Sequence, residues 1–112
     1  MNNNYWVYIL YCQNGCYYTG YTTDLTKRYE AHLNGTASKY TRSFKPVRIA
    51  QCWQIKNKSM AMQLENRIKQ LSRINKEKII EKPDLLYQII EVPNVIAVHS
   101  GDTTVFCGFI KR

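Results

Sequence analysis

The stretch YWVYILYCQNGCYYTGYTTDL, residues 5–25, carries two runs of aromatic, aliphatic and β-branched residues on either side of Gln13-Asn14-Gly15. Runs of this composition, separated by turn-forming residues, are typical of two antiparallel strands joined by a tight loop. Thr22-Thr23-Asp24 then offers side chains suited to cap a helix, and apolar residues recur every fourth position up to Asn34-Gly35. The stretch therefore predicts a strand, a loop, a second strand and a helix, in that order.

Beyond this stretch, segments with strand and helix character alternate along the chain. We expect a polar loop at 36–45 and a third strand at 47–55. A longer helix is expected to start at a cap on Ser59 and to run to Leu71, because apolar residues follow a helical spacing there. A further helical segment is expected at 76–82.

The residues after Pro83 differ from the rest in charge and periodicity. Two short apolar runs, 94–98 and 103–109, flank His99-Ser100-Gly101-Asp102, a pattern that favours a β-hairpin. The sequence thus predicts an α+β fold, in which a small three-stranded antiparallel sheet is flanked by helices and carries an additional C-terminal β-hairpin. We expect residues 1–86 to form the main domain and 87–112 an accessory segment packed on it.

The chain has 112 residues and a formal net charge of +8. Residues 1–82 hold 14 Lys or Arg and 5 acidic residues, whereas 83–110 hold three acidic residues and no Lys or Arg. A basic surface of this density favours a polyanion such as nucleic acid, although it also fits a surface that only confers solubility. No apolar run approaches the ~18 residues of a membrane span, and the N-terminus lacks a signal-peptide pattern. We therefore expect a cytoplasmic protein without a membrane partner.

The four cysteines are Cys12, Cys16, Cys52 and Cys107. A zinc site normally combines two closely spaced pairs, and only Cys12 and Cys16 have such a spacing here. In a cytosolic chain large enough to bury a core, free thiols are favoured over disulfides.

Tyrosines and charged groups are concentrated at a few positions. Six of the nine tyrosines lie between Tyr5 and Tyr21, a density beyond what a strand pair needs. Arg28 and His32 are four residues apart on one face of the first helix, and Glu65 lies at the edge of the apolar face of the longer helix. Taken singly, each of these charged residues is more often a surface residue than a catalytic one.

Taken together, these motifs resemble the GIY-YIG nuclease superfamily, most closely the short bacterial proteins related to the N-terminal catalytic domain of the excision nuclease UvrC. The resemblance extends over about residues 5–86. The motifs that carry it are Trp6-Val7-Tyr8, Tyr18-Thr19-Gly20, Thr22-Thr23-Asp24-Leu25 with Arg28 and His32, Ser38-Lys39-Tyr40-Thr41-Arg42, and Glu65 with Lys69 and Leu71.

The resemblance implies a three-stranded antiparallel sheet flanked by helices and one active site around a single divalent ion, Mg²⁺ or Mn²⁺. By position, the implied catalytic residues are Tyr8, Tyr18, Arg28, His32 and Glu65. It also implies that the Lys-Tyr-Thr-Arg stretch borders the cleft, and Lys39, Tyr40, Arg42 and Lys45 are the residues expected to contact nucleic acid.

These residue types suit phosphodiester cleavage. Glu65 is the expected metal ligand, since a hard ion that keeps most of its waters needs only one carboxylate. Arg28 has the fork geometry for the scissile phosphate and stays charged. Tyr8 is the candidate general base, and whether it or His32 finally takes the proton is left open. Tyr18 is expected to orient water or phosphate.

A shared site requires Tyr8 and Tyr18 on the same face of the hairpin. A two-residue loop would put them on opposite faces. A three-residue loop with Gly15 in the left-handed conformation pairs Tyr8 with Gly20 and puts the two tyrosines on one face. We therefore predict the longer loop, and expect Gly20 to leave room for a phosphate beside the phenol.

The function predicted is that of a metal-dependent endonuclease acting on DNA, selective for structure rather than sequence, in DNA repair or recombination. The alternative is a non-catalytic nucleic-acid-binding domain that retains the fold, and RNA is the alternative substrate. With no second DNA-binding module in the chain, targeting comes from the cleft or from a protein partner. The sequence does not decide between a monomer and a homodimer.

Overall fold

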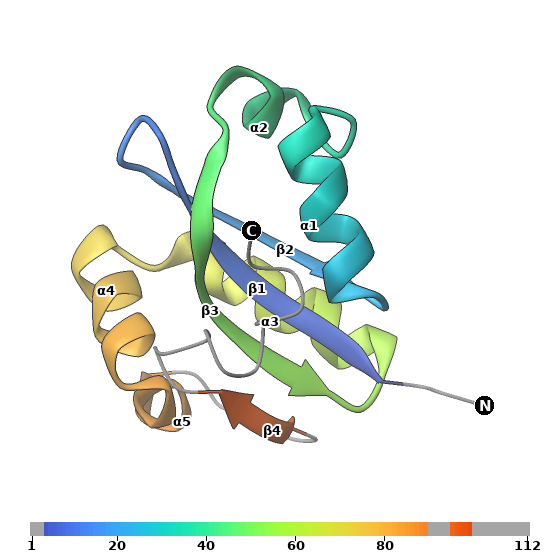
Figure 1. Ribbon diagram of the computed structural model, residues 1–112. Helices are drawn as coiled ribbons and strands as arrows, with labels where there is room; N and C mark the ends of the chain where they lie inside the picture. Colours follow the sequence, from blue (N-terminus) through green and yellow to red (C-terminus); the bar gives the residue numbers. More distant parts are fainter. Residues whose placement is uncertain (1–3, 90–94, 100–112) are drawn as a thin grey trace.

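The computed structural model describes residues 4–89 and 95–99 (Figure 1). The fold is α+β, as predicted, with helices on both faces of an antiparallel sheet. Along the chain the elements are β1 (Tyr5–Cys12), β2 (Tyr17–Thr22), α1 (Leu25–Asn34), α2 (Lys39–Ser43), β3 (Pro46–Ile55), α3 (Lys58–Gln70), α4 (Arg73–Glu81), a 3₁₀ turn (Pro83–Leu85), α5 (Leu86–Ile89) and β4 (Val95–His99).

The strand order is β2-β1-β3-β4, so β2 forms one edge of the sheet. The predicted antiparallel arrangement of β1, β2 and β3 is confirmed. β4 lies where the first strand of the C-terminal hairpin was expected, and it pairs with β3. The described residues therefore show a fourth strand rather than a hairpin, because the expected second strand, 103–109, lies outside them.

The β1–β2 loop has the predicted three residues. Gly15 adopts φ +82°, its N–H donates to the Cys12 carbonyl at 2.8 Å, and the Cys12 N–H donates to the Cys16 carbonyl at 2.9 Å. Tyr8 consequently pairs with Gly20. Because side chains alternate between faces along a strand, Tyr8 and Tyr18 lie on the same face, as the shared site requires.

Side-chain caps determine where the helices begin. Asp24 caps α1 as predicted, accepting from the Lys27 N–H at 3.0 Å, and Gly35 ends the helix at φ +82°. The cap of α3 is Asn57 rather than Ser59, so this helix begins at Lys58, two residues before the start that a cap on Ser59 predicts. Ser72 caps α4, which therefore begins at Arg73 rather than at residue 76.

The loop expected at 36–45 contains a helix, α2, which is a correction to the sequence-based prediction. Ser38 caps it by accepting from the Thr41 N–H at 3.1 Å. The helix has five residues and buries only Thr41. It was missed because one buried residue produces no apolar periodicity.

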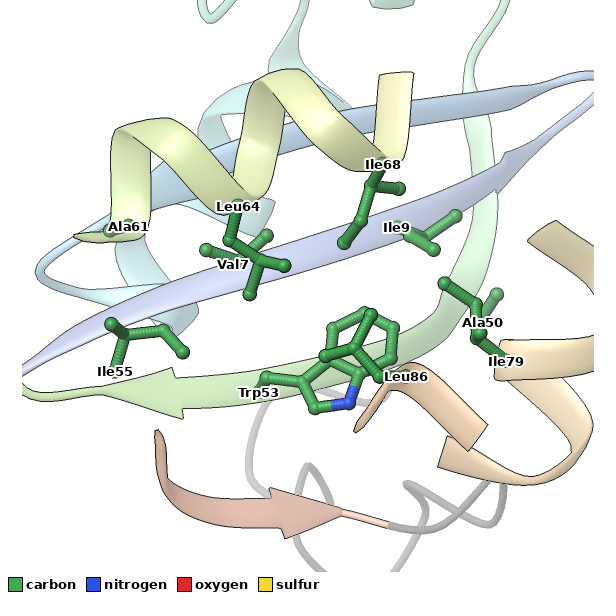
Figure 2. Close-up of a cluster of buried hydrophobic side chains, with 10 residues drawn as sticks. All are labelled: Val7, Ile9, Ala50, Trp53, Ile55, Ala61, Leu64, Ile68, Ile79 and Leu86. Atoms are coloured by element: carbon green, nitrogen blue, oxygen red, sulfur yellow. The ribbon is translucent and has the colours of Figure 1, made fainter. Parts of the chain in front are cut away.

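The sheet separates two clusters of buried side chains. The α3 face holds ten buried apolar residues, including Ile68, Trp53 and Ile79, and Figure 2 shows α3 pointing its apolar side chains onto β1 and β3. The α1 face holds Tyr8, Leu10, Cys12, Leu25, Tyr29, Ile49 and Cys52. Helices α1 and α2 contact each other next to this second cluster.

Two further expectations concern cysteines and membrane helices. Cys12, Cys16 and Cys52 are all free thiols, as expected, and Cys107 lies outside the described residues. Among the residues that the structure describes, none of the helices combines the length and apolarity needed to cross a bilayer.

Candidate active site

A cavity of about 520 Å³ lies beside the edge strand β2. Four of the five predicted catalytic residues line it: Tyr8 from β1, Tyr18 from β2, Arg28 from α1 and Glu65 from α3. These residues are up to 57 positions apart in the sequence. The fold thus brings together groups from two strands and from helices on both faces of the sheet.

Gly20 has a different structural role from the one expected. A methyl group at Gly20 would lie 2.5 Å from the Tyr8 hydroxyl oxygen and 2.8 Å from the ring carbon that bears it. The position that a side chain at Gly20 would take is therefore filled by the phenol of Tyr8, while both residues also line the cavity. The missing side chain allows the Tyr8 ring to lie against β2.

Tyr8 and His32 share a buried hydrogen bond of 2.8 Å between the tyrosine oxygen and Nε2. Tyr8 is 2% exposed and His32 is fully buried. Burial, with smaller contributions from Tyr18 and Glu65, raises the pKa of Tyr8 far above its usual value, and Arg28 opposes this. Burial and the charge of Arg28 lower the pKa of His32 to about 4. At neutral pH the pair is a neutral phenol bonded to a neutral imidazole.

His32 lies behind Tyr8 and does not line the cavity. Its Nδ1 is 2.7 Å from the hydroxyl of Thr41, which is also fully buried. That hydroxyl is in turn 2.8 Å from the Ser38 hydroxyl. Thr41 belongs to the Lys-Tyr-Thr-Arg motif, but the sequence predicts no role for it. Its contact with His32 depends on how α2 packs against α1.

Glu65 supplies the carboxylate that lines the cavity. Its side chain is 17% exposed, it lines the cavity, and one carboxylate oxygen is 3.4 Å from Lys69 Nζ. Lys69 is half exposed and separated by one helical turn, so this ion pair is weak and a cation can displace it. A single carboxylate at an open, polar cavity fits Mg²⁺ or Mn²⁺, which keep several waters.

A zinc cluster has no counterpart in the described ranges 4–89 and 95–99. No three His, Cys, Asp or Glu side chains come together there in a group able to hold a metal ion. Among the described residues, the Glu65 carboxylate therefore does not belong to a closed metal site of several protein ligands.

Lys58 also lines the cavity and was missed by the sequence analysis. It is the first residue of α3, two helical turns before Glu65. Its side chain adds a second positive group to the cavity, on the side opposite α1. A lysine at the start of an amphipathic helix looks like any solvated residue, and no signal in the sequence distinguished it.

The expected nucleic-acid contacts on and after α2 are placed unequally. Lys39 and Arg42 are exposed. Tyr40 stacks on Tyr18 with ring centroids 5.9 Å apart, and its hydroxyl accepts from Asn14 Nδ2 at 2.8 Å. Lys45 Nζ donates to the Leu33 carbonyl at 2.8 Å, so this ammonium caps the end of α1.

Comparison with known proteins shows which family the chain resembles. Residues 4–78 match the GIY-YIG catalytic domain. The chain is 44% identical over 77 residues to the UPF0213 protein BH0048 of Halalkalibacterium halodurans, covering 69% of this chain and 82% of that protein. It is 48% identical over 73 residues to the UPF0213 protein VNG_2274C of Halobacterium salinarum, covering 65% and 95%.

A solved structure is similar as well. The solution NMR structure of the UPF0213 protein BH0048 from Bacillus halodurans has 40% sequence identity and a TM-score of 0.48 to this chain. The match covers 79% of this chain and 94% of that one.

Proposed function

Because the chain belongs to the GIY-YIG catalytic domain family, we propose that it is a metal-dependent endonuclease that hydrolyses phosphodiester bonds in DNA. The observation that carries the proposal is the cavity beside β2, where Tyr8, Tyr18, Arg28 and Glu65 meet. Its cationic groups suit a polyanion, and its acidic group suits a divalent ion. The net charge of +8 supports the same class of substrate.

Arg28 and Lys58 are proposed to bind the substrate. The Arg28 guanidinium stays protonated throughout the reaction and can donate two parallel hydrogen bonds to the scissile phosphate. Lys58, on the other side of the cavity, is suited to a neighbouring phosphate as a point charge. Two cationic contacts fix the orientation of the backbone without reading a base, which agrees with selectivity for DNA structure rather than sequence.

Tyr8 and His32 are proposed to handle the proton of the attacking water. The water's proton passes to the Tyr8 oxygen as the Tyr8 proton passes to His32 Nε2. The water oxygen forms a bond to phosphorus, and the leaving oxygen takes the electron pair of the bond that breaks. Tyr18, whose ring packs edge-on against His32 at 5.1 Å, orients the water or phosphate.

Glu65 would hold a divalent ion, which would stabilise the negative charge that develops on the phosphate and the leaving oxygen. The low exposure of the Glu65 side chain strengthens this interaction relative to one in bulk water. DNA repair or recombination is the proposed biological setting, with targeting by the cleft or by a protein partner.

The test is a cleavage assay with purified protein on nicked, flapped, branched, single-stranded and duplex DNA, with Mg²⁺, Mn²⁺ or chelator. We expect metal-dependent cleavage, and a loss of about 10³-fold in Glu65→Gln, since a group that organises transition-state charge is removed. Glu81→Gln is the matched control, because Glu81 is an exposed carboxylate on α4 outside the cavity.

If wild type and Glu65→Gln show the same background on every substrate, the enzyme proposal is wrong. Salt-sensitive binding that does not respond to metal removal would then identify a nucleic-acid-binding domain without catalytic activity. Competition between RNA and DNA at fixed salt identifies the preferred nucleic acid.

A further inference from the structure

His32 lies between two hydroxyl groups. Its Nε2 is 2.8 Å from the Tyr8 oxygen and its Nδ1 is 2.7 Å from the Thr41 oxygen. A neutral imidazole carries one proton, so one nitrogen donates and the other accepts. The choice of tautomer decides whether His32 can accept a proton from Tyr8, and this makes its other neighbour, Thr41, significant.

The Tyr8 hydroxyl has one hydrogen-bond partner among the described residues, His32 Nε2. Tyr8 keeps its proton at neutral pH and is almost completely buried. If Nε2 carried the proton, it would donate to Tyr8, and the phenol proton would have no acceptor on the protein. A phenol that is 2% exposed and has no protein acceptor for its proton is less favourable than one that donates to His32. The pairing therefore favours donation from Tyr8 to an unprotonated Nε2.

Thr41 completes this arrangement on the other side of the ring. Its hydroxyl can accept from Nδ1–H because it has a second partner, the Ser38 oxygen at 2.8 Å, to which it can donate. Ser38 is itself fixed, since its oxygen accepts from the Thr41 N–H as the cap of α2. Donation then runs in one direction, from Tyr8 to His32, from His32 to Thr41 and from Thr41 to Ser38.

We propose that Thr41 is a positioning residue that holds His32 as the Nδ1-protonated tautomer, so that Nε2 is free to receive the proton of Tyr8. The inference rests on the proposed nuclease function for its catalytic consequence and on the geometry alone for the tautomer. It assigns α2 a role beyond substrate contact, because this short helix carries Thr41 and its N-cap Ser38 holds the Thr41 hydroxyl.

Loss of the Thr41 hydroxyl should reverse the tautomer. His32 and Thr41 are both fully buried, so Nδ1–H loses its acceptor when Thr41 becomes valine. The unpaired donor on Nδ1 favours the tautomer with the proton on Nε2. Nε2 then donates to the Tyr8 oxygen and can no longer accept the Tyr8 proton, so proton transfer from Tyr8 to His32 is blocked.

The experiment is a ¹⁵N–¹H NMR measurement of which His32 ring nitrogen carries the proton, on the metal-free protein without DNA. We expect Nδ1 in the wild type and in Thr41→Ser, and Nε2 in Thr41→Val. In cleavage assays, kcat of Thr41→Val should fall about 10- to 100-fold with KM changed less than about twofold, and Thr41→Ser should restore it.

Thr36→Val is the matched control, because the Thr36 hydroxyl, in the segment between α1 and α2, donates to the Ala31 carbonyl, which is not part of the chain of bonds at His32. It should leave both the tautomer and kcat unchanged. A wild-type protein with the proton on Nε2, or a folded Thr41→Val that keeps it on Nδ1, would overturn the inference. A wild type that cuts no DNA would overturn the proposed function instead, while the NMR result would still decide the tautomer.

Discussion

The two faces of the sheet hold their buried residues in different ways. On the α3 face, ten buried apolar side chains pack together, and the one buried polar atom without a partner among the described residues is the Trp53 indole nitrogen (Figure 2). On the α1 face, a smaller cluster packs beside two fully buried polar side chains, His32 and Thr41, linked in a hydrogen-bonded chain to Tyr8.

This difference suggests that the α3 face mainly stabilises the fold, whereas the α1 face mainly serves the reaction. Apolar contacts are non-directional and tolerate changes that preserve volume, so the α3 face can stabilise the fold without a unique geometry. A buried hydrogen-bonded chain depends on every distance along it, and it is costly when one member is missing. We therefore expect substitutions on the α3 face to lower the free energy of unfolding and those on the α1 face to change the reaction.

The largest expected effect on stability comes from Ile68→Ala on the α3 face. Ile68 is fully buried among α3, β1 and β3, so truncation leaves a cavity and should cost about 2–5 kcal/mol of unfolding free energy. Urea denaturation measures this. The cleavage rate of the folded fraction should stay within about twofold, and Ile68→Val should cost about 0.5–1.5 kcal/mol. A rate loss matching that of Glu65→Gln would contradict the expectation that the α3 face affects stability and not the reaction.

The second prediction concerns acid stability, which we assign to the α1 face. The pKa of His32 is about 4 in the folded protein, below the ordinary histidine value of about 6.5, because burial and then Arg28 disfavour its charged form. The unfolded chain therefore binds a proton first as the pH falls. The unfolding free energy that comes from keeping His32 neutral is fully present above pH 6.5. It declines as the pH falls towards 4, and the total loss is about 3 kcal/mol. Unfolding free energies measured across this range should show a flatter slope for His32→Phe.

The contact between Tyr8 and Gly20 gives the third prediction. In Gly20→Ala the new methyl group would meet the Tyr8 hydroxyl, so the phenol must move and its bond to His32 is lost. We expect a cost of about 1–3 kcal/mol in unfolding free energy together with a fall in kcat. Gly15→Ala is the control, because no atom lies within 4 Å of its added methyl and only the positive φ opposes it. It should be destabilised with kcat unchanged.

Much of this arrangement follows from local sequence signals. The resemblance to the GIY-YIG family puts Tyr8 and Tyr18 in one site, and strand alternation then requires the three-residue loop at Gly15 that the structure has. The two ends of α1, capped by Asp24 and Gly35, are likewise predictable from the sequence. Glu65 was placed at the edge of an apolar helical face, where the structure has it. In each case, neighbours within a few residues determine the geometry.

Features that depend on tertiary contacts could not be predicted in this way. The contact between His32 and Thr41 crosses the turn between α1 and α2, and the sequence treated that segment as a loop. Lys58 resembles a solvated helix residue until α3 is placed against β2. The close contact between Gly20 and the Tyr8 ring could not be predicted either, because it depends on how the Tyr8 side chain packs against β2.

A smaller effect is expected at Lys58, where the two faces meet at the cavity. Lys58→Met keeps the length of the side chain but removes its charge, so one phosphate contact is lost. We expect KM to rise about tenfold, equivalent to about 1.4 kcal/mol, and the dependence of binding on salt to become shallower. Lys56→Met is the matched control, because Lys56 is exposed and does not line the cavity. Equal effects of both variants would show that only overall charge matters.

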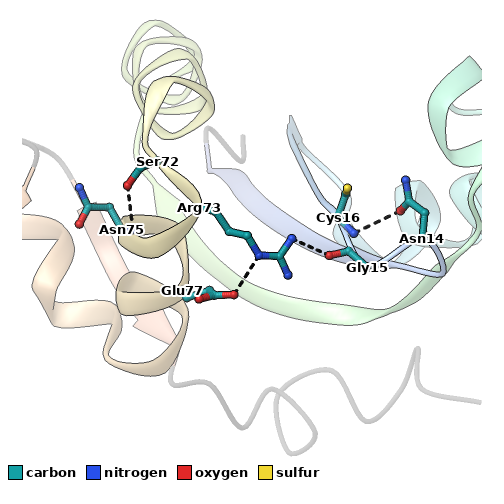
Figure 3. Close-up of polar contacts among 7 residues, drawn as sticks. All are labelled: Asn14, Gly15, Cys16, Ser72, Arg73, Asn75 and Glu77. Atoms are coloured by element: carbon teal, nitrogen blue, oxygen red, sulfur yellow. Dashed lines mark hydrogen bonds and ion pairs between the residues drawn. The ribbon is translucent and has the colours of Figure 1, made fainter.

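The smallest effect is expected at the rim of the α3 face, where α4 contacts the β1–β2 loop. Arg73 donates to the Gly15 carbonyl at 2.7 Å and to Glu77 at 3.1 Å (Figure 3). Its guanidinium also lies 4.9 Å from the centre of the Tyr17 ring. Both members of the ion pair are about half exposed, so water replaces most of what the pair contributes. Glu77→Gln should leave the thermal midpoint unchanged within error, and Arg73→Met should lower it only slightly. A large drop for Arg73→Met would mean that a directional polar contact helps to stabilise the α3 face, and the separation of the two faces would then fail at this edge.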